Sequence, residues 1–501
     1  MIPLLLLCAL ALDSIHYTRG LEAAQSKRWD EARQEFLEGH REAPSDKRFL
    51  IELAGIDYRT GQFARARAEL RAALRIDPSD AYANDFLGTL YFLDSNYEAA
   101  IKYWNRAGKP RIESIETVPP PPVRPELLDR ALAFAPGEIL SQDHYSSTLA
   151  WIRGLDSFGD SRLELIARPQ EQFDAVLRWT PTNRWTEAAA GLDGIPFQTF
   201  RYERHNLGQS AATIGATYRW DAQKRRILAE YSAPLEGDPR MRYRLYTDDR
   251  SETWNFEGTN PGAPGDFRLR KVEAGASLRR TPSGRFSWEM GARVAERWFG
   301  GVTPFASGAS VVSSIAANYR LLNLPEQGLT LDAKGVAEVG RFFSSAGGIY
   351  SRTEASLEGH WRPDTRSKYE ASFGVRTGRI LGAAPFDELF SLGRERDDAM
   401  GLPGYIGTRW GKKGLAPTGG QYAVAHFDLF REVWKPWLGA VDVGPLMDAG
   451  RMWHQISGDF AGQILVDGGL AVRLRLPGVS FVLSYARPMR GGVGAWDTAV
   501  H

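Results

Sequence analysis

The sequence predicts a multidomain protein with an N-terminal α-solenoid, a small module of helices and strands, and a C-terminal transmembrane antiparallel β-barrel of about 16 strands. Three observations carry this prediction. Small and bulky residues recur at a fixed step over the first 110 residues. Residues 111–180 show runs typical of one strand, two helices and two further strands. Over residues 181–501, apolar and polar residues alternate in long runs.

The overall composition limits what the chain can be. A length of 501 residues allows two or three domains. The 62 basic and 61 acidic side chains give a net charge of +1, so neither a global field nor a basic run points to nucleic acid as a partner. Mean hydropathy is −0.35, and no apolar run reaches the ~20 residues of a membrane-spanning helix. The lack of a long apolar run does not exclude membrane-spanning β-strands, because only every second residue of such a strand is apolar.

Residues 1–12 resemble a signal peptide. Ile2–Leu12 is a short apolar run, and Ala9-Leu10-Ala11 offers small residues for cleavage. The run carries no Lys or Arg, so an apolar start to the first helix of the solenoid is the alternative. Cys8 is the single cysteine of the chain. If the segment is removed, disulfides and thiolate metal sites are excluded, and we expect no cofactor.

Residues 13–110 are expected to form three tetratricopeptide repeats. A step of 34 separates the members of four sets: Gly20, Ala54 and Gly88; Ala32, Ala66 and Ala100; Phe36, Leu70 and Trp104; Pro44 and Pro78. This period, with small residues where two helices meet closely, is the pattern of that repeat. Helix pairs of this kind stack into a curved solenoid, whose concave face typically holds peptides or partner proteins. A purely structural spacer is the alternative.

Residues 111–180 are expected to form a separate module with the element order β-α-α-β-β. The predicted elements are a strand at Arg111–Val118, helices at Glu126–Phe134 and from Ser141 to about Leu155, and a hairpin of Arg162–Ala167 with Gln172–Trp179. Pro119–Pro122 forms a stiff turn after the first strand. Pro125 lies where the first helix would begin.

Residues 181–501 give the strongest signal. In Phe286–Val294 every second residue is apolar, and the residues between are mostly polar or charged. Such a period of two predicts strands with one apolar and one polar face. The polar faces carry charges of both signs, which a watery lumen can hold and a soluble core cannot. A secreted soluble β-domain is the alternative.

The number of strands follows from the spacing of the runs. One strand and its loop take roughly 20 residues in this template, which allows about 16 strands. Six tryptophans near strand ends are expected to mark the two membrane interfaces: Trp220, Trp298, Trp361, Trp434, Trp437 and Trp453. Ala495–Val500 is short for a closing strand. Either it is a short last strand, or the reading frame is cut.

The stretch from Asp387 to Trp453 resembles the end of the BamA-like barrels, the outer-membrane assembly-factor (bacterial surface antigen) superfamily. In that family a Leu/Val-Arg-Gly-Tyr/Phe tip on a long loop folds back into the lumen and meets an Asp-x-Gly motif on the wall. Leu402, Gly404 and Tyr405 match the tip, and Asp448 and Gly450 match the wall motif. The β-α-α-β-β module is similar to a POTRA domain, whose edge strand can pair with an incoming polypeptide.

This sequence departs from the family at the tip, where Pro403 replaces the arginine that pairs with the aspartate. Proline carries no donor. The hypothesis is that Arg409, or less favourably Arg394, reaches Asp448 and holds the loop by a charge-assisted pair. In the alternative, Asp448 is solvated in the lumen and Gly404-Tyr405 is only a turn.

The resemblance implies insertion of outer-membrane proteins, or translocation of polypeptides, without enzyme chemistry. The chain has no His-Glu-x-x-His, no Gly-x-Ser-x-Gly elbow and no P-loop. The expected location is the bacterial outer membrane, with the N-terminal domains in the periplasm. Expected partners are the lipid bilayer, unfolded outer-membrane or secreted polypeptides, and periplasmic proteins. A passive porin-like channel and a barrel-anchored adaptor that works through its tetratricopeptide repeats are the alternatives.

Overall fold

The computed structural model describes residues 15–158, 160–180, 198–256, 265–363, 367–394, 401–436, 439–457, 462–476, 479–489 and 494–500. The signal-peptide-like segment at residues 1–12, with Cys8, lies outside these ranges. The chain forms two compact units: one contains residues up to 114 with 136–142 and 165–175, and the other contains 115–135, 143–164 and 176–501. The division into domains at 13–110, 111–180 and 181–501 stays a prediction.

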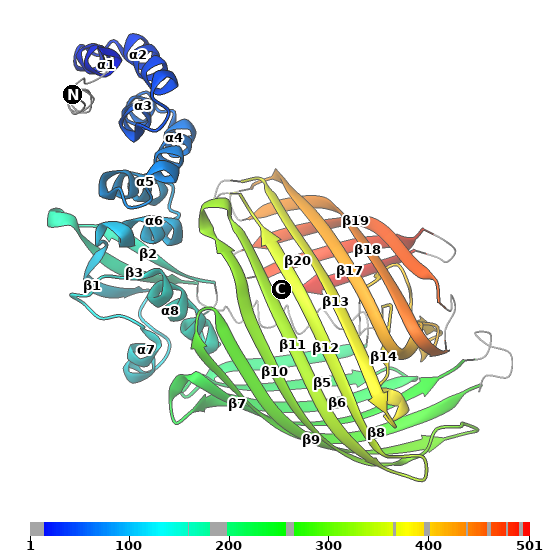
Figure 1. The fold of residues 1–501 in the computed structure, drawn as a ribbon. Helices are drawn as coiled ribbons and strands as arrows, with labels where there is room; N and C mark the ends of the chain where they lie inside the picture. Colours follow the sequence, from blue (N-terminus) through cyan, green and yellow to red (C-terminus); the bar gives the residue numbers. More distant parts are fainter. Residues whose placement is uncertain are drawn as a thin grey trace, which may run out of the picture. The chain divides into compact units, whose positions relative to one another are not determined.

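The N-terminal part is an array of helical hairpins, as the 34-residue period predicts (Figure 1). Its helices are α1 (Ile15–Gln25), α2 (Trp29–Glu42), α3 (Lys47–Arg59), α4 (Phe63–Ile76), α5 (Ala81–Leu93) and α6 (Tyr97–Trp104). Asp46, Asp80 and Asn96 cap α3, α5 and α6 by accepting a backbone N–H at the helix start. The second helices of the three hairpins begin at Trp29, Phe63 and Tyr97, each 34 residues after the last.

The periodic small residues lie where the two helices of a hairpin meet. A Cβ added at Gly20 would lie 2.4 Å from the Phe36 ring, and one added at Gly88 would lie 2.4 Å from the Trp104 ring. Phe36 and Trp104 are buried. The bulky member of one helix therefore fills the space that the small member of the other leaves open.

The glycine at the third hairpin is expected to set its stability. Gly88→Ala overpacks the Trp104 contact and is expected to lower the free energy of unfolding by about 1–3 kcal/mol. Gly55→Ala is the matched control, because Gly55 lies in α3 with nothing within 4 Å of an added Cβ. That change is expected to be neutral or to stabilise by up to about 1 kcal/mol. Thermal unfolding of the full chain, followed by circular dichroism at 222 nm, checks both; equal midpoints for the two variants would contradict the prediction.

A buried polar network joins three helices of the array. Arg33 on α2 donates to Asp57 on α3 at 2.5 Å and to Glu69 on α4 at 3.2 Å. Arg65 on α4 lies 3.5 Å from the same Asp57 oxygen. Burial first, and then the nearby Asp57 carboxylate, raise the pKa of Glu69 to about 7, although Arg33 opposes the shift. Folding therefore favours the protonated form of Glu69.

The raised pKa of Glu69 predicts a pH-dependent solenoid. In the unfolded chain Glu69 loses its proton near pH 4.5, whereas in the folded chain it does so near pH 7. Stability is therefore expected to fall as pH rises from about 4.5 to about 7. Glu69→Gln should remove about 1–3 kcal/mol of that fall, while Glu31→Gln, at an exposed site on α2, should leave it. Melting at 222 nm across this pH range tests the difference, and parallel curves for wild type and Glu69→Gln would contradict it.

The small module has the predicted element order β-α-α-β-β. Its elements are β1 (Arg111–Val118), α7 (Pro125–Ala131), α8 (Gln142–Gly154), β2 (Ser161–Ala167) and β3 (Gln172–Trp179). The helix expected at Glu126–Phe134 ends earlier, at Ala131. The three strands form one sheet in the order β1-β3-β2. This order leaves β2 at an edge of the sheet.

The C-terminal part is a closed β-barrel (Figure 1). Its long strands are β4 (Thr199–Leu207), β5 (Ala212–Trp220), β6 (Lys224–Leu235), β7 (Asp238–Trp254), β8 (Phe267–Ser283), β9 (Phe286–Gly300), β10 (Gly308–Leu324), β11 (Leu329–Phe343), β12 (Ile349–Trp361), β13 (Tyr369–Gly382), β17 (Thr418–Trp434), β18 (Ala440–Ser457), β19 (Ile464–Leu476), β20 (Val479–Pro488) and β21 (Ala495–Val500).

The barrel closes between β21 and β4. Within the described ranges, 18 segments belong to it, of which β14 (Phe390–Ser391), β15 (Thr408–Arg409) and β16 (Lys412–Lys413) have two residues each. The expectation of about 16 strands is therefore close. Ala495–Val500 is a short last strand, and it pairs antiparallel with β20 from Ala486 to Phe481.

The barrel has its apolar residues outside and its charges inside. On β9, Met290 and Val294 are 49% and 53% exposed, whereas Arg297 is 0% exposed. On β11, Val339 is 59% exposed and its neighbour Glu338 is 7% exposed. This is the reverse of a water-soluble fold, in which large apolar side chains fill the interior. A soluble β-domain does not account for it.

Some aromatic rings of the wall lie flat over a glycine of the neighbouring strand. A Cβ at Gly275 would come within 2.5 Å of the Tyr246 ring, and a Cβ at Gly378 within 2.5 Å of the Tyr422 ring. The Tyr246 hydroxyl donates to Glu273 at 2.7 Å, so the flat ring also holds an inward carboxylate. A glycine under the ring is therefore required at these two positions.

Candidate functional site

The connection between β13 and β17 spans residues 383–417, and we call it the lumen loop. Its described parts, 383–394 and 401–417, contact the inner side of the barrel wall. It contains the short helix η6 (Phe386–Glu388) and the segments β14, β15 and β16. Phe390 of β14 pairs with Gly419 of β17. Lys413 of β16 forms a parallel bridge with Trp254 of β7, and its backbone carbonyl accepts the N–H of Asn255 at 2.8 Å. The loop is thus held to two walls of the barrel by backbone pairing.

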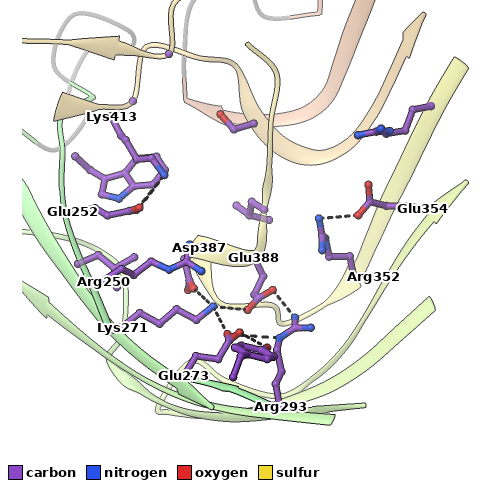
Figure 2. Close-up of a pocket in the computed structure, with 18 residues that line it drawn as sticks. Arg250, Glu252, Lys271, Glu273, Arg293, Arg352, Glu354, Asp387, Glu388 and Lys413 are labelled. Atoms are coloured by element: carbon purple, nitrogen blue, oxygen red, sulfur yellow. Dashed lines mark hydrogen bonds and ion pairs between the residues drawn. The ribbon is translucent and has the colours of Figure 1, made fainter. Parts of the chain in front are cut away.

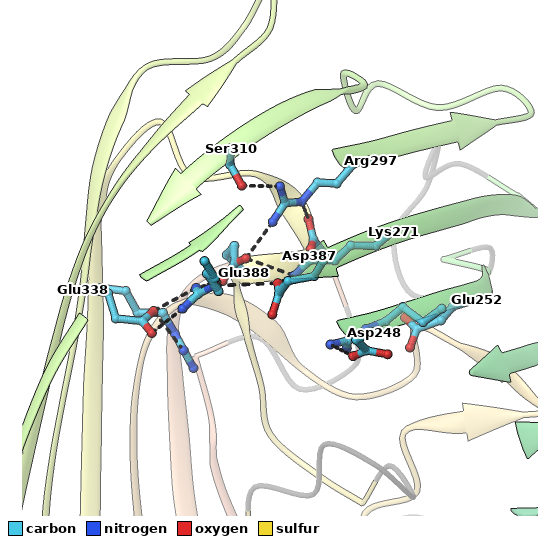
Figure 3. A network of polar contacts seen from close by, with 12 residues as sticks. Asp248, Glu252, Lys271, Arg297, Ser310, Glu338, Asp387 and Glu388 are labelled. Carbon is cyan, nitrogen blue, oxygen red and sulfur yellow. Dashed lines mark hydrogen bonds and ion pairs between the residues drawn. The ribbon is translucent and has the colours of Figure 1, made fainter. Parts of the chain in front are cut away.

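Two carboxylates at the start of the lumen loop meet three cations of the wall. We call Asp387, Glu388, Lys271, Arg293 and Arg297 the charged anchor (Figures 2 and 3). Arg297 donates to Asp387 at 2.5 Å and to Glu388 at 2.7 Å. Lys271 lies 3.2 Å from each carboxylate. Arg293 reaches the other oxygen of Glu388 at 2.9 Å.

Neighbouring groups complete the charge balance of the anchor. Glu273 lies 2.8 Å from Lys271, and Glu338 lies 2.6 Å from Arg293. Arg297 also donates to the Ser310 hydroxyl at 2.6 Å (Figure 3). Arg297 is completely buried. Removing one partner from such a buried pair costs about 3–5 kcal/mol, because the charge left behind has no counter-charge.

The charged anchor borders both a cavity and an aromatic cluster. The cavity has a volume of about 440 Å³ and is lined by all members of the anchor except Arg297, together with Arg250, Glu252, Arg352 and Glu354, among others (Figure 2). Phe386, the residue before Asp387, packs among rings of the wall. Its centroid lies 4.1 Å from that of Phe305 and 4.7 Å from that of Trp254. Apolar packing and ion pairs thus fix the same short helix.

The tip of the lumen loop, Leu402–Tyr405, lies against β18 and β19. The N–H of Leu402 donates to Asp448 at 3.4 Å, and the N–H of Gly404 donates to Asp467 at 2.5 Å. Asp448 and Asp467 are direct cross-strand partners. The structure therefore brings the predicted tip and the predicted wall aspartate together, and it adds Asp467.

Two glycines allow this close approach. A Cβ at Gly404 would lie 2.8 Å from a carboxylate oxygen of Asp467 and 2.9 Å from the backbone of Arg487. A Cβ at Gly450 would lie 3.1 Å from Leu402. Leu402 is fully buried, and Tyr405 lies in the same apolar cluster. The N–H of Tyr405 donates to the carbonyl of Leu402 at 2.9 Å, so the tip is also a tight turn.

The expected arginine clamp is not what holds the tip. Arg409 is exposed in β15 and, within the described part of the chain, makes no ion pair with Asp448. The Arg394 guanidinium instead donates to the backbone carbonyl of Trp496 on β21. Backbone N–H groups take the place of the guanidinium, because a tight turn points them at the carboxylates without any charged side chain. The substitution at Pro403 therefore leaves the tip docked.

Sequence reasoning missed the charged anchor. Asp387 and Glu388 stand out in the sequence only as two adjacent acidic residues, and their partners lie 90 or more residues away along the chain. The alternation of the strands does predict that Lys271, Arg293 and Arg297 point inward. Inward cations need carboxylate partners, so acidic residues of an inner loop could have been expected beside them.

The described ranges show no sign of a metal or of a helical span. No group of three or more His, Cys, Asp or Glu side chains in them could hold a metal ion. No helix in the same ranges has the length and apolar content needed to cross a membrane.

Comparisons with known proteins agree with the two folds. A family model of the tetratricopeptide repeat matches residues 23–90. CdiB from Escherichia coli, at 14% sequence identity, superimposes with a TM-score of 0.50 over 78% of this chain and 75% of that chain. BamA from Haemophilus ducreyi lacking POTRA domains 1–3, at 13% identity, gives a TM-score of 0.44 over 78% of this chain and 84% of that one. Comparison with curated protein sequences finds no match. At this identity the likeness to CdiB bears on the fold alone.

Neutralising the charged anchor is expected to free the start of the lumen loop. Asp387→Asn with Glu388→Gln leaves the buried Arg297 without a counter-charge and removes partners from the charge networks of Lys271 and Arg293. Deuterium uptake over residues 386–394 should therefore accelerate by about tenfold or more. Glu289→Gln is the control, because its pair with Arg279 is more exposed and lies outside the anchor. Hydrogen exchange with mass spectrometry on the full chain in detergent measures both. Unchanged uptake in the double variant would show that packing alone holds the loop.

Proposed function

We propose that this chain is a bacterial outer-membrane barrel that inserts or translocates polypeptides, with its tetratricopeptide repeats and its small module in the periplasm. The observation that carries the membrane location is the reversed polarity of the wall. Large apolar side chains such as Ile315, Val375 and Leu470 are about half exposed around the outside. An apolar outer band over a polar lumen is the architecture that lipid requires.

The aromatic residues support the same location. Trp220, Trp298, Trp361 and Trp434 lie at or near strand ends and are 38–64% exposed. Such positions suit the two membrane interfaces, where an amphipathic ring meets the headgroups. Trp453 is partly buried in β18, and Trp437 lies outside the described residues.

The lumen loop favours polypeptide handling over passive conduction. The loop is fixed at its start by the charged anchor and at its tip by Asp448 and Asp467. Buried ion pairs that hold a loop to the inner wall are hard to explain in an open pore. They suit a barrel whose interior is closed until a client displaces the loop. The fold of CdiB and the resemblance of the tip motif to BamA-like barrels point to the same class.

The N-terminal parts fit the reception of an unfolded chain. A solenoid of tetratricopeptide repeats binds extended peptides on its concave face. The edge strand β2 offers unpaired backbone groups that can add a strand from an incoming polypeptide. We place these steps before transfer to the barrel. No enzyme chemistry is required.

Depletion of the protein is expected to change the population of outer-membrane or secreted proteins. A quantitative census of outer-membrane and medium fractions should show selective loss of one or more clients, while total inner-membrane proteins stay unchanged. Complementation with wild-type protein should restore them.

Two outcomes would favour the alternatives. An unchanged census together with large, steady currents in planar bilayers would support a passive channel. A census restored by residues 13–110 tethered to another anchor would support an adaptor whose barrel only attaches it to the membrane.

A further inference from the structure

A second cavity of the barrel lies beside the tip of the lumen loop. It has a volume of about 610 Å³, within the ~300–1,000 Å³ typical of pockets that hold small ligands. Its ionisable wall groups are the carboxylates Glu370, Asp428 and Asp448 and the basic side chains His360, His426 and Arg473. Gly401 and Pro403 of the loop close one side of it.

The cations of this wall are already used. Arg473 donates to Glu370 at 2.9 Å and to Asp442 at 2.8 Å. His426 lies 3.2 Å from Glu358. Glu370 is therefore neutralised, and among the described residues no basic side chain makes an ion pair with Asp428 or Asp448, although His426 is the cross-strand partner of Asp448.

Asp428 and Asp448 are held by neutral donors only. Asp428 accepts from the Ser372 hydroxyl at 3.2 Å. One oxygen of Asp448 accepts the long bond from the N–H of Leu402, and its second oxygen has no hydrogen-bond partner in the described part of the chain. Asp448 is 6% exposed and lines the cavity.

The neighbour of Asp448 increases the excess of negative charge. Asp467 faces it across the strands and is 0% exposed. One oxygen of Asp467 accepts the N–H of Gly404, whereas the other is buried with no partner among the described residues. Two carboxylates so placed disfavour each other's ionised form, and a cation beside them would relieve that repulsion.

We propose that this cavity binds the guanidinium group of an arginine that a polypeptide in the lumen supplies, with Asp448 and Asp428 as its carboxylate partners. Arginine fits better than lysine, because its planar fork can meet two oxygens at once and it is more weakly hydrated. The loop itself offers no such group, since its residues at the cavity wall are Gly401 and Pro403. That the arginine belongs to a client rests on the proposed function; the presence of the site does not.

The test uses two peptides that differ in charge alone. The full chain in detergent is titrated with Ac-Gly-Gly-Arg-Gly-Gly-NH₂ and with the same peptide carrying citrulline, the neutral isostere of arginine. Isothermal titration calorimetry should show the arginine peptide binding about 30-fold or more tightly than the citrulline peptide. Equal affinities, or no binding of the arginine peptide, would overturn the proposal.

Variants of the chain locate the site. Asp448→Asn and Asp428→Asn should each weaken the arginine peptide about tenfold. Pro403→Arg should abolish its binding, because the new side chain occupies the cavity from within. Asp332→Asn, which removes a carboxylate paired with Arg320 elsewhere in the barrel, should change nothing.

A gel-shift assay of heat-modifiable barrel migration confirms that each variant is folded. Unchanged affinity in both aspartate variants would overturn the proposal even if the peptide binds. The result is independent of the depletion census. Peptide binding with an unchanged census would leave the arginine site standing and contradict the proposed function. A changed census without peptide binding would support the proposed function and overturn the arginine site.

Discussion

The ion pairs between the lumen loop and the wall are the interaction on which the interior of this barrel depends. Asp387 and Glu388 meet Lys271, Arg293 and Arg297 in a space where Arg297 is fully buried. Charges placed so deep are tolerated only when each has its partner. The inward charges of β8 and β9 therefore fix where the loop lies, and the loop in turn makes those strand positions tolerable.

The two ends of the lumen loop are held by different kinds of interaction. At the charged anchor the loop supplies carboxylates and the wall supplies cations. At the tip the wall supplies the carboxylates Asp448 and Asp467, and the loop supplies only backbone N–H groups. In the first contact each carboxylate of the loop forms ion pairs with at least two cations. The second leaves negative charge over, and that difference is what makes the tip side of the lumen a candidate for binding something basic.

Periodic features of this molecule could be predicted from the sequence, and single contacts could not. The step of 34 located the helical hairpins, because Phe36 and Trp104 repeat a packing contact that every hairpin needs. Alternation located the strands, because a barrel wall has only two faces. The tip and its aspartate followed from a family resemblance. The charged anchor could not be predicted, because nothing in the local sequence indicates which inward cation pairs with Asp387. The predicted pair of Arg409 with Asp448 was wrong because every residue except proline has a backbone N–H, so a backbone donor cannot be recognised from residue types.

The glycines beneath Tyr246 and Tyr422 have a consequence for the space inside the barrel. A tyrosine that stands upright on a strand reaches far toward the axis, whereas one that lies across a neighbouring glycine adds little to the thickness of the sheet. The inner diameter available to the lumen loop is thus partly set by two glycines of the wall, and the Tyr422 ring packs directly against Phe390 of the loop, with centroids 4.7 Å apart. A side chain introduced at Gly275 or Gly378 would push the tyrosine ring toward the barrel axis. The lumen loop would then be displaced before the strands of the wall.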